Sequence, residues 1–318
     1  MFDVVALGEL LIDFTCLSVD GTGYPTMAAH PGGAPANFLA ALASFGAKTA
    51  LIGKVGQDAF GQMLTRTLTD AGISTAGLVA AEDVFTTLAF VTLDGQGNRE
   101  FSFARKPGDD TRLTAEEVDL SLLDQTRVFH FGTLSLTDEP ARSATRRAVE
   151  YARSRGALIT FDPNLRRPLW HSLEEAKEQM LWGLRQADVV KISDEEVRFL
   201  FDLAPEEGAE YLHRELGVPL VFVTCGAEGC LFRNAKAQGH EPSLPGVHVV
   251  DTTGAGDIFG GSAVWKLLRT GKKPDALEEG ELREVVRFAC TAAGLSTTRH
   301  GGISSIPTLA EVEAALAR

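Results

Sequence analysis

Residues 128–161 read VFHFGTLSLTDEPARSATRRAVEYARSRGALITF. The stretch opens with an apolar run at 128–131, continues with a helix-period segment at 138–155 and closes with a second apolar run at 157–161. A short strand, a helix and another short strand predict a right-handed βαβ unit, in which both strands lie parallel in one sheet. This stretch therefore predicts an α/β fold.

The same alternation of strand and helix continues on both sides of this unit. Further strands are predicted at 4–7, 49–55, 188–192 and 221–224. Further helices are predicted at 35–45, 58–71, 173–186, 194–202, 256–270 and 281–297. Repeated βαβ units predict a mostly parallel central sheet with helices on both faces, which is a three-layer α/β/α sandwich.

Two stretches, 11–30 and 84–106, break this alternation because they carry period-2 patterning with no helix after it. Residues 94–98 read DGQGN and predict a hairpin turn within the second stretch. We expect a small antiparallel sheet that stands off the main body as a lid, inserted into a single domain spanning 1–318. Its outer face could also form a homodimer contact, since antiparallel sheets often leave one face uncovered.

Composition excludes several functional classes. The 318 residues carry a formal net charge of −13, which argues against nucleic-acid and anionic-membrane partners because both need a basic surface. The four cysteines (Cys16, Cys225, Cys230 and Cys290) form no C-x-x-C pair and predict reduced thiols. Neither a signal peptide nor a membrane-spanning stretch is predicted, so we expect a cytoplasmic location.

The strongest chemical motif is the run DTTGAGD from Asp251 to Asp257, which leads directly into a predicted helix. Gly254 and Gly256 allow tight backbone geometry, and their amides at the start of a helix would form an anion hole for a transferring phosphoryl group. Asp257 could accept a proton from an attacking hydroxyl. The alternative interpretation is a glycine turn in which Asp257 only caps the helix.

Three further stretches are weaker on their own. Gly32 and Gly33 lead towards Asn37 in a helix start, where an amide could bind sugar hydroxyls, although a purely structural loop is an equal alternative. Arg166 follows a predicted strand, where ligands of α/β sheets bind, and its guanidinium could hold a phosphate. Residues 224–229 follow another strand and could contact a nucleotide.

Absent motifs narrow the chemistry further. The sequence contains no G-x-x-x-x-G-K-[ST] loop, no protein-kinase glycine-rich loop or D-F-G, no zinc-type Cys/His cluster and no G-x-S-x-G. The stretch after the first strand lacks the G-x-G-x-x-G of dinucleotide-binding oxidoreductases. A phosphoryl transferase built on this sequence would therefore need the Gly254 turn as its anion hole.

These motifs resemble the PfkB/ribokinase family of carbohydrate kinases along nearly the whole chain. The first family signature runs from Gly32 through residues 53–56 to residues 58–61, and the second is the run from Asp251 to Asp257. Residues 8–14, 129–136, 162–170 and 191–196 are most similar to the fructokinases of bacteria and plants. The resemblance implies a ribokinase-like fold and ATP-dependent phosphorylation of a sugar, at the 6-hydroxyl if the sugar is fructose.

The resemblance also implies roles for individual residues. The catalytic group would comprise the base Asp257, the turn residues Gly254, Ala255 and Gly256, and Arg166 at the transferring phosphate. The sugar would be bound by Asp13, Gly32, Gly33, Asn37 and Arg105. ATP would be bound by Asn164, Lys191, Thr224, Gly226, Gly229, Gly254 and Gly256. Glu196 would act indirectly on Mg²⁺, and an activating K⁺ would be held by Asp251, Thr253, Ser296, Arg299, Gly301 and Ser305.

The chain departs from the family pattern at two positions. Ser193 stands where many relatives have the Asn of an N-x-x-E motif, while Glu196 is retained. Asp109 replaces the Ala of a lid segment of the form R-x-P-x-A-D, which puts the exact sugar in question unless its side chain faces solvent. The alternative substrate is 2-keto-3-deoxygluconate, and the alternative class is a non-catalytic sugar sensor on the same fold.

Overall fold

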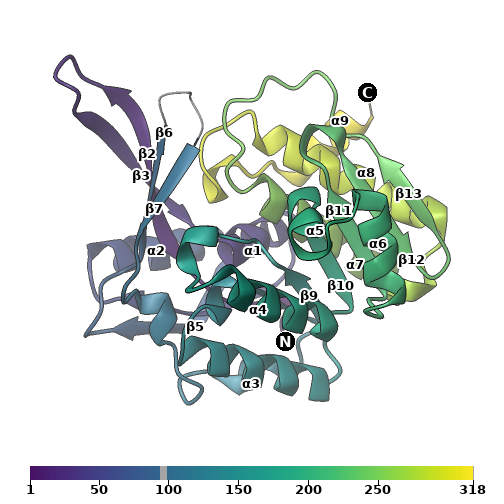
Figure 1. The fold of residues 1–318 in the computed structure, drawn as a ribbon, viewed down its shortest axis with the longest axis horizontal. Coiled ribbons are helices and arrows are strands. Elements are labelled where there is room, and N and C mark those ends of the chain that lie inside the picture. Colours follow the sequence, from purple (N-terminus) through teal and green to yellow (C-terminus); the bar gives the residue numbers. More distant parts are fainter. Residues whose placement is uncertain (94–98, 318) are drawn as a thin grey trace.

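The computed structural model describes residues 1–93 and 99–317 (Figure 1). The hairpin turn expected at 94–98 lies outside these residues. Within them, nine strands form one large sheet, in the order β13-β12-β11-β10-β9-β8-β1-β4-β5. The strands are β1 (Val4–Leu7), β4 (Thr49–Gly56), β5 (Ile73–Ala81), β8 (Val128–Gly132), β9 (Leu158–Asp162), β10 (Val189–Ser193), β11 (Leu220–Thr224), β12 (Cys230–Asn234) and β13 (Gln238–Glu241).

The pairings from β5 through β11 are parallel, as the repeated βαβ pattern predicts. β12 then joins β11 antiparallel, and β13 joins β12 antiparallel. The chain passes from β1 to β4 on one side, and later returns to place β8 on the other side of β1. The strand order therefore reverses at β1, and the carboxyl ends of β1 and β8 flank the point where α/β sheets bind ligands.

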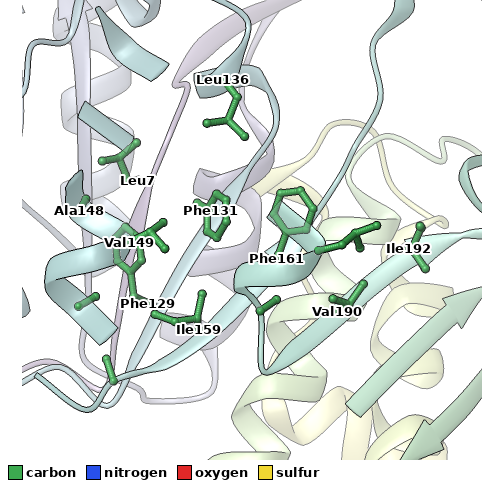
Figure 2. Close-up of a cluster of buried hydrophobic side chains, with 14 of the residues drawn as sticks. Leu7, Phe129, Phe131, Leu136, Ala148, Val149, Ile159, Phe161, Val190 and Ile192 are labelled. Carbon is green, nitrogen blue, oxygen red and sulfur yellow. The ribbon is translucent and has the colours of Figure 1, made fainter. Parts of the chain in front are cut away.

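Helices cover both faces of this sheet. On one face the apolar cluster joins Leu7, Phe129, Phe131 and Phe161 to the helices α3 (Ala141–Ser154), α4 (Leu173–Gln186), α5 (Asp194–Phe201) and α6 (Pro205–Arg214), and Figure 2 shows part of it. The other face packs against α1 (Ala34–Ser44), α2 (Ala59–Asp70), α7 (Ala255–Thr270), α8 (Glu279–Ser296) and α9 (Leu309–Leu316). The predicted three-layer α/β/α sandwich is confirmed.

A second, smaller sheet rises from one end of this body (Figure 1). Its strands, in the order β3-β2-β6-β7, are β2 (Leu11–Val19), β3 (Pro25–Gly32), β6 (Leu88–Leu93) and β7 (Arg99–Ala104). β2 pairs antiparallel with β3, and β6 with β7, as expected. The central pairing of β2 with β6 is parallel, because the two hairpins lie side by side in the same sense.

Two of the outer-layer helices approach so closely that only glycine fits between them. A β-carbon on Gly261 of α7 would overlap the carbonyl oxygen of Phe38 in α1, and one on Gly260 would lie 3.3 Å from the Phe38 ring. This contact fixes α7 against α1. None of the helices among the described residues has the length and apolar character to cross a membrane.

Gly261→Ala is expected to lower the free energy of unfolding by about 2 kcal/mol, because the new methyl group must push α7 away from backbone atoms of α1. Gly280→Ala is the matched control, since a β-carbon at that position in α8 meets no atom within 4 Å. Urea denaturation of both variants measures the difference. Equal stability of the two variants would contradict the close packing of α1 and α7.

Candidate active site

A cleft of ≈ 760 Å³ opens between the carboxyl ends of the large sheet's strands and the small sheet. This volume is in the usual range of small-molecule sites. Most of its lining comes from the main body, outside the small sheet. These residues are Glu9, Gly33, Ala34, Asn37, Leu134, Asn164, Leu165, Arg166, Arg167, Pro168, Glu195, Thr252, Thr253, Gly254 and Asp257. The small sheet contributes Leu11 and Asp13 from β2, Val91 from β6 and Phe103 from β7.

Asp257 lies in the first turn of α7, at the floor of this cleft. The helix begins at Gly254, whose φ of 75° lies in the left-handed region that favours glycine. A β-carbon on Gly254 would lie 3.2 Å from Asn37 Nδ2, so the absence of a side chain lets α1 and α7 meet here. The first amides of a helix have no partner within it, and Thr252, Thr253 and Gly254 line the cleft at this helix start, which suits an anion hole.

Asn37 holds the Asp257 carboxylate. Its Nδ2 donates a hydrogen bond to Asp257 Oδ2 at 2.9 Å, across 220 residues of sequence. Burial raises the pKa of Asp257, while the Asn37 hydrogen bond and the charges of Lys191 and Arg166 act to lower it. The Asn37 Oδ1 is buried and has no hydrogen-bond partner among the described residues. Asn37 therefore both orients the carboxylate and presents one unused acceptor at the cleft.

The glycine pair before α1 lies against two acidic residues, Glu9 and Asp13. A β-carbon on Gly33, which has a φ of 114°, would overlap the carbonyl oxygen of Glu9. Glu9 Oε1 also accepts a hydrogen bond from the amide of Ala34 at 2.9 Å. On the adjacent residue, a β-carbon on Gly32 would overlap the carboxylate of Asp13. Close approach of the Glu9 backbone therefore requires glycine at position 33, Gly32 leaves room for the Asp13 carboxylate, and the Glu9 side chain anchors the loop.

Asp13 reaches the cleft from β2. Burial raises its pKa to about 7, Arg166 opposes that rise, and the nearby carboxylates of Asp257 and Asp251 add to it. These influences place Asp13, Arg166 and Asp257 in one electrostatic group. Two carboxylates and one guanidinium facing the same space can bind hydroxyl groups and an anion together.

Arg166 is presented by the loop that follows β9. Asn164 in this loop has a φ of 46°, which is uncommon outside glycine and places the next residues at the cleft. Glu196 fixes the loop, because its Oε1 accepts from the amide of Leu165 at 2.7 Å and its Oε2 from the amide of Ser193 at 2.9 Å. Ser193 in turn caps α5 through its hydroxyl, so it completes a capping box in the position of the family's Asn.

The predicted ATP residues separate into three groups. Asn164 and Gly254 line the cleft. Thr224 ends β11 beside Ser193 of β10, and Gly226 and Gly229 follow it with φ values of 54° and 101°. Lys191 lies beneath the Gly254–Asp257 turn instead, in an ion pair with Asp162 at 3.0 Å. Gly256 is immediately above it.

The predicted cation residues lie on two segments that meet next to the Gly254–Asp257 turn. Asp251 Oδ1 accepts from the amide of Thr253 at 2.9 Å, and Asp251 Oδ2 accepts from the amide of Gly301 at 3.0 Å. The amide of Asp251 also donates to the carbonyl of Thr297, one residue after Ser296 at the end of α8. Arg299 pairs with Glu311, and Ser305 donates to the Gly302 carbonyl at 2.8 Å. The segments 251–253 and 296–305 are thus held together, with carbonyl and carboxylate oxygens between them.

Arg105 occupies a different place from the predicted sugar contact. Its guanidinium is buried and donates to Asp110 at 2.6 Å, to Thr137 at 2.9 Å and to the carbonyl of Leu134 at 2.8 Å. It does not line the cleft. The physical reason is that Asp110 and the 134–137 segment together satisfy the buried charge. Arg105 therefore holds Leu134, which does line the cleft, and ties β7 to the body.

Asp109 is neither at the sugar mouth nor facing solvent. It is fully buried, and its Oδ1 accepts from the amides of Thr87 at 3.0 Å and of Asp110 at 2.8 Å. Its Oδ2 is buried without a hydrogen-bond partner among the described residues. Burial and the neighbouring Asp110 carboxylate raise the pKa of Asp109 to about 7. Asp109 is thus a structural carboxyl at the base of β6.

Asp109→Asn is expected to stabilise the fold at pH 8 and to change little at pH 4.5. The folded-state pKa of Asp109 is raised to about 7, above the unfolded value, so the wild type loses stability as pH rises from about 4 to 7. Asn keeps an acceptor for both amides and does not ionise. We expect a gain of about 1–3 kcal/mol at pH 8 in urea denaturation. A difference that is independent of pH would contradict the burial of an ionisable Asp109.

Several cleft residues were given no individual role by the sequence, although most of them lie within the stretches that resemble fructokinases. They are Glu9, Leu11, Val91, Phe103, Leu134, Arg167 and Glu195. Val91 and Phe103 belong to the period-2 stretches, whose alternation gives which residues share a face but not which face meets the cleft. Glu9 follows β1 and Gly8, and its position near a strand end within the family-like stretch 8–14 is the signal that could have identified it.

Comparison with known proteins agrees with this geometry. The family described as pfkB family carbohydrate kinase matches residues 1–309. Fructokinase-1 of Zea mays is 43% identical over 314 residues, covering 97% of this chain and 96% of the relative. Among solved structures, fructokinase with bound ATP from Xylella fastidiosa has a TM-score of 0.91 at 30% identity, covering 100% of this chain and 99% of that one. Fructokinase of Vibrio cholerae O395, in a form with bound fructose, ADP and calcium ion, has a TM-score of 0.85 at 30% identity, covering 99% of each chain.

Proposed function

Since the chain belongs to the PfkB family of carbohydrate kinases, we propose that it phosphorylates fructose at the 6-hydroxyl with ATP as the donor. The observation that carries the proposal is the Asp257 carboxylate at the start of α7, held by Asn37 and facing Arg166 across one cleft. The choice of fructose is supported by relatives named fructokinase that are at least 40% identical over nearly the whole chain.

The reaction follows from the positions of these groups. The oxygen of the 6-hydroxyl attacks the γ-phosphorus, its proton passes to Asp257, and the bond from the γ-phosphorus to the bridging oxygen breaks to release ADP. The Gly254–Asp257 amides and Arg166 hold the negative charge of the transferring group. Asp13, Asn37 and the Gly32–Gly33 backbone bind and orient the sugar, so that one hydroxyl faces Asp257.

Mg²⁺ and K⁺ are the proposed cations. Both carboxylate oxygens of Glu196 accept hydrogen bonds from backbone amides, which fits an indirect role in which Glu196 positions the Arg166 loop. Mg²⁺ would then be held by phosphate oxygens and water. The oxygen-rich junction of 251–253 with 296–305 fits a large monovalent cation. Mg²⁺ would neutralise charge on the phosphates, and K⁺ would stiffen the turn that carries Gly254.

The small sheet is the proposed lid. Leu11, Asp13, Val91 and Phe103 place one of its faces over the cleft, where closure would exclude water and limit ATP hydrolysis. Its projecting β2–β3 hairpin exposes Leu17, Val19 and Tyr24 to solvent (Figure 1). These exposed apolar side chains support the proposal of a homodimer through the lid. We also propose the cytoplasmic location that the sequence leads us to expect.

The test is ADP release measured with fructose, 2-keto-3-deoxygluconate, ribose and adenosine, each with and without K⁺. The proposal expects the highest kcat/KM with fructose and a rise on adding K⁺. A higher kcat/KM with 2-keto-3-deoxygluconate would replace the substrate and leave the kinase chemistry intact. Absence of turnover with all four compounds would favour a non-catalytic sugar sensor.

A further inference from the structure

An ion pair lies directly beneath the catalytic turn. Lys191 in β10 donates to both carboxylate oxygens of Asp162, the last residue of β9, at 3.0 and 3.3 Å. The side chains are 13% and 7% exposed, so both charges are largely removed from water. Neither residue lines the cleft in which the sugar and the phosphates would lie.

The Lys191 ammonium touches the turn at Gly256. A β-carbon on Gly256 would lie 2.9 Å from Lys191 Nζ, so the absence of a side chain at this position lets the ammonium approach the turn closely. Gly256 immediately precedes Asp257 in the sequence. The ammonium therefore lies next to the backbone of the proposed anion hole, at a position that does not line the cleft.

Stability does not explain this pair. Burying a salt bridge gains little on average, because the desolvation of two charges offsets their attraction. The neighbouring His130 does not share the charge, since burial and then Lys191 lower the pKa of His130 to about 3 and keep the ring neutral. A lasting positive charge thus stays beneath Gly256 at neutral pH.

We infer that Lys191 is a positioning residue for phosphoryl transfer, which Asp162 holds under the Gly254–Asp257 turn so that its ammonium favours the ionised, proton-accepting form of Asp257. The inference rests on the proposed role of Asp257 as the base. It differs from the direct ATP contact that the family resemblance implies for Lys191.

The charges around Asp257 predict in which direction each substitution changes the pKa of Asp257. Arg166 after β9 and Lys191 in β10 favour its ionised form, while Asp13 in β2 and Asp162 in β9 repel it. The charge of Glu196 in α5 acts to raise the pKa of both Lys191 and Asp162. Removing the Lys191 charge should therefore raise the pKa of Asp257, and removing the Asp162 charge should lower it. A purely structural pair would give effects in the same direction, because either substitution leaves one buried charge unpaired.

The experiment measures the pH dependence of kcat/KM for fructose in the full-length protein and in Lys191→Met, Asp162→Asn and the double variant. The pH at which kcat/KM falls on the acidic side of the profile is expected to rise by about one unit in Lys191→Met and to fall in Asp162→Asn. In the double variant this acidic limb should lie close to that of the wild type. The kcat of Lys191→Met should fall about 10-fold or more, with the KM for ATP changed less than about 3-fold.

Shifts in the same direction, or no shift, would overturn the inference, and so would a loss confined to the KM for ATP. Asp257→Asn is assayed in parallel. If Asp257→Asn retains turnover, the proposed role of Asp257 as the base is wrong. If Asp257→Asn is inactive but the pH profiles of the Lys191 and Asp162 variants do not shift, only the proposed role of Lys191 is wrong. Circular dichroism checks that each variant is folded. If Lys191→Met does not fold, the directions of the pH shift in Asp162→Asn and in the double variant decide between the two interpretations.

Discussion

Asp257→Asn is expected to lower kcat with fructose by about 10²–10⁴-fold, the usual cost of losing a general base. The substitution keeps the shape of the side chain and an oxygen that can accept the 2.9 Å hydrogen bond from Asn37. The sugar and ATP should therefore bind with nearly unchanged affinity, because the loss arises in the proton transfer. Initial-rate kinetics and ADP release measure the effect, with Asp70→Asn on the exposed end of α2 as a control.

The pH profile gives a second reading of the same residue. Because burial raises the pKa of Asp257, the wild-type activity should fall with acid at a higher pH than an ordinary aspartate would give. A base must be deprotonated, so activity is lost as pH falls through that pKa. Asp13, with a pKa raised to about 7, titrates beside it and shares the limb. Near-wild-type kcat in a folded Asp257→Asn variant would show that another group takes the proton.

The central sheet could be predicted because buried parallel strands leave a strong signal. The runs at 128–131, 157–161 and 188–192 correspond to β8, β9 and β10 within about one residue at each end. β5 has no such signal, since alternating small and polar residues (ISTAGLVAA) suit a strand at the sheet edge and a loop equally. β12 and β13 extend the sheet by hairpins and not by βαβ units, so the alternation of strand and helix could not locate them.

The candidate site divides in a similar way. Gly33, Gly254 and Asp257 could be predicted because close backbone approach and a helix start leave local marks in the sequence. The places of Arg105, Asp109 and Lys191 depend on partners that do not line the cleft, namely Thr137, Thr87 and Asp162. Nothing in a single sequence shows whether a charged side chain near a motif turns to the ligand or to a buried partner. Hydrogen bonds and ion pairs with buried partners placed these three side chains.

Arg166→Met is expected to lower kcat by about 10²–10³-fold, a loss comparable to that of an oxyanion-hole donor. Arg166 lines the cleft after β9 and acts against the burial-raised pKa of both Asp13 and Asp257, so its charge lies near both carboxylates. A phosphoryl group in that space would accept two hydrogen bonds from the planar fork. Methionine keeps the length and the apolar stem but removes the charge.

The same substitution should move the acidic limb of kcat/KM to higher pH, because both carboxylates lose a nearby cation. Arg166→Lys should recover part of kcat, since it restores the charge without the planar fork. Arg147→Met, at an exposed position of α3, serves as the control for loss of an arginine far from the cleft. If Arg166→Met changed only the KM for fructose, the guanidinium would bind the sugar, and the Gly254–Asp257 amides would have to stabilise the phosphoryl charge without it.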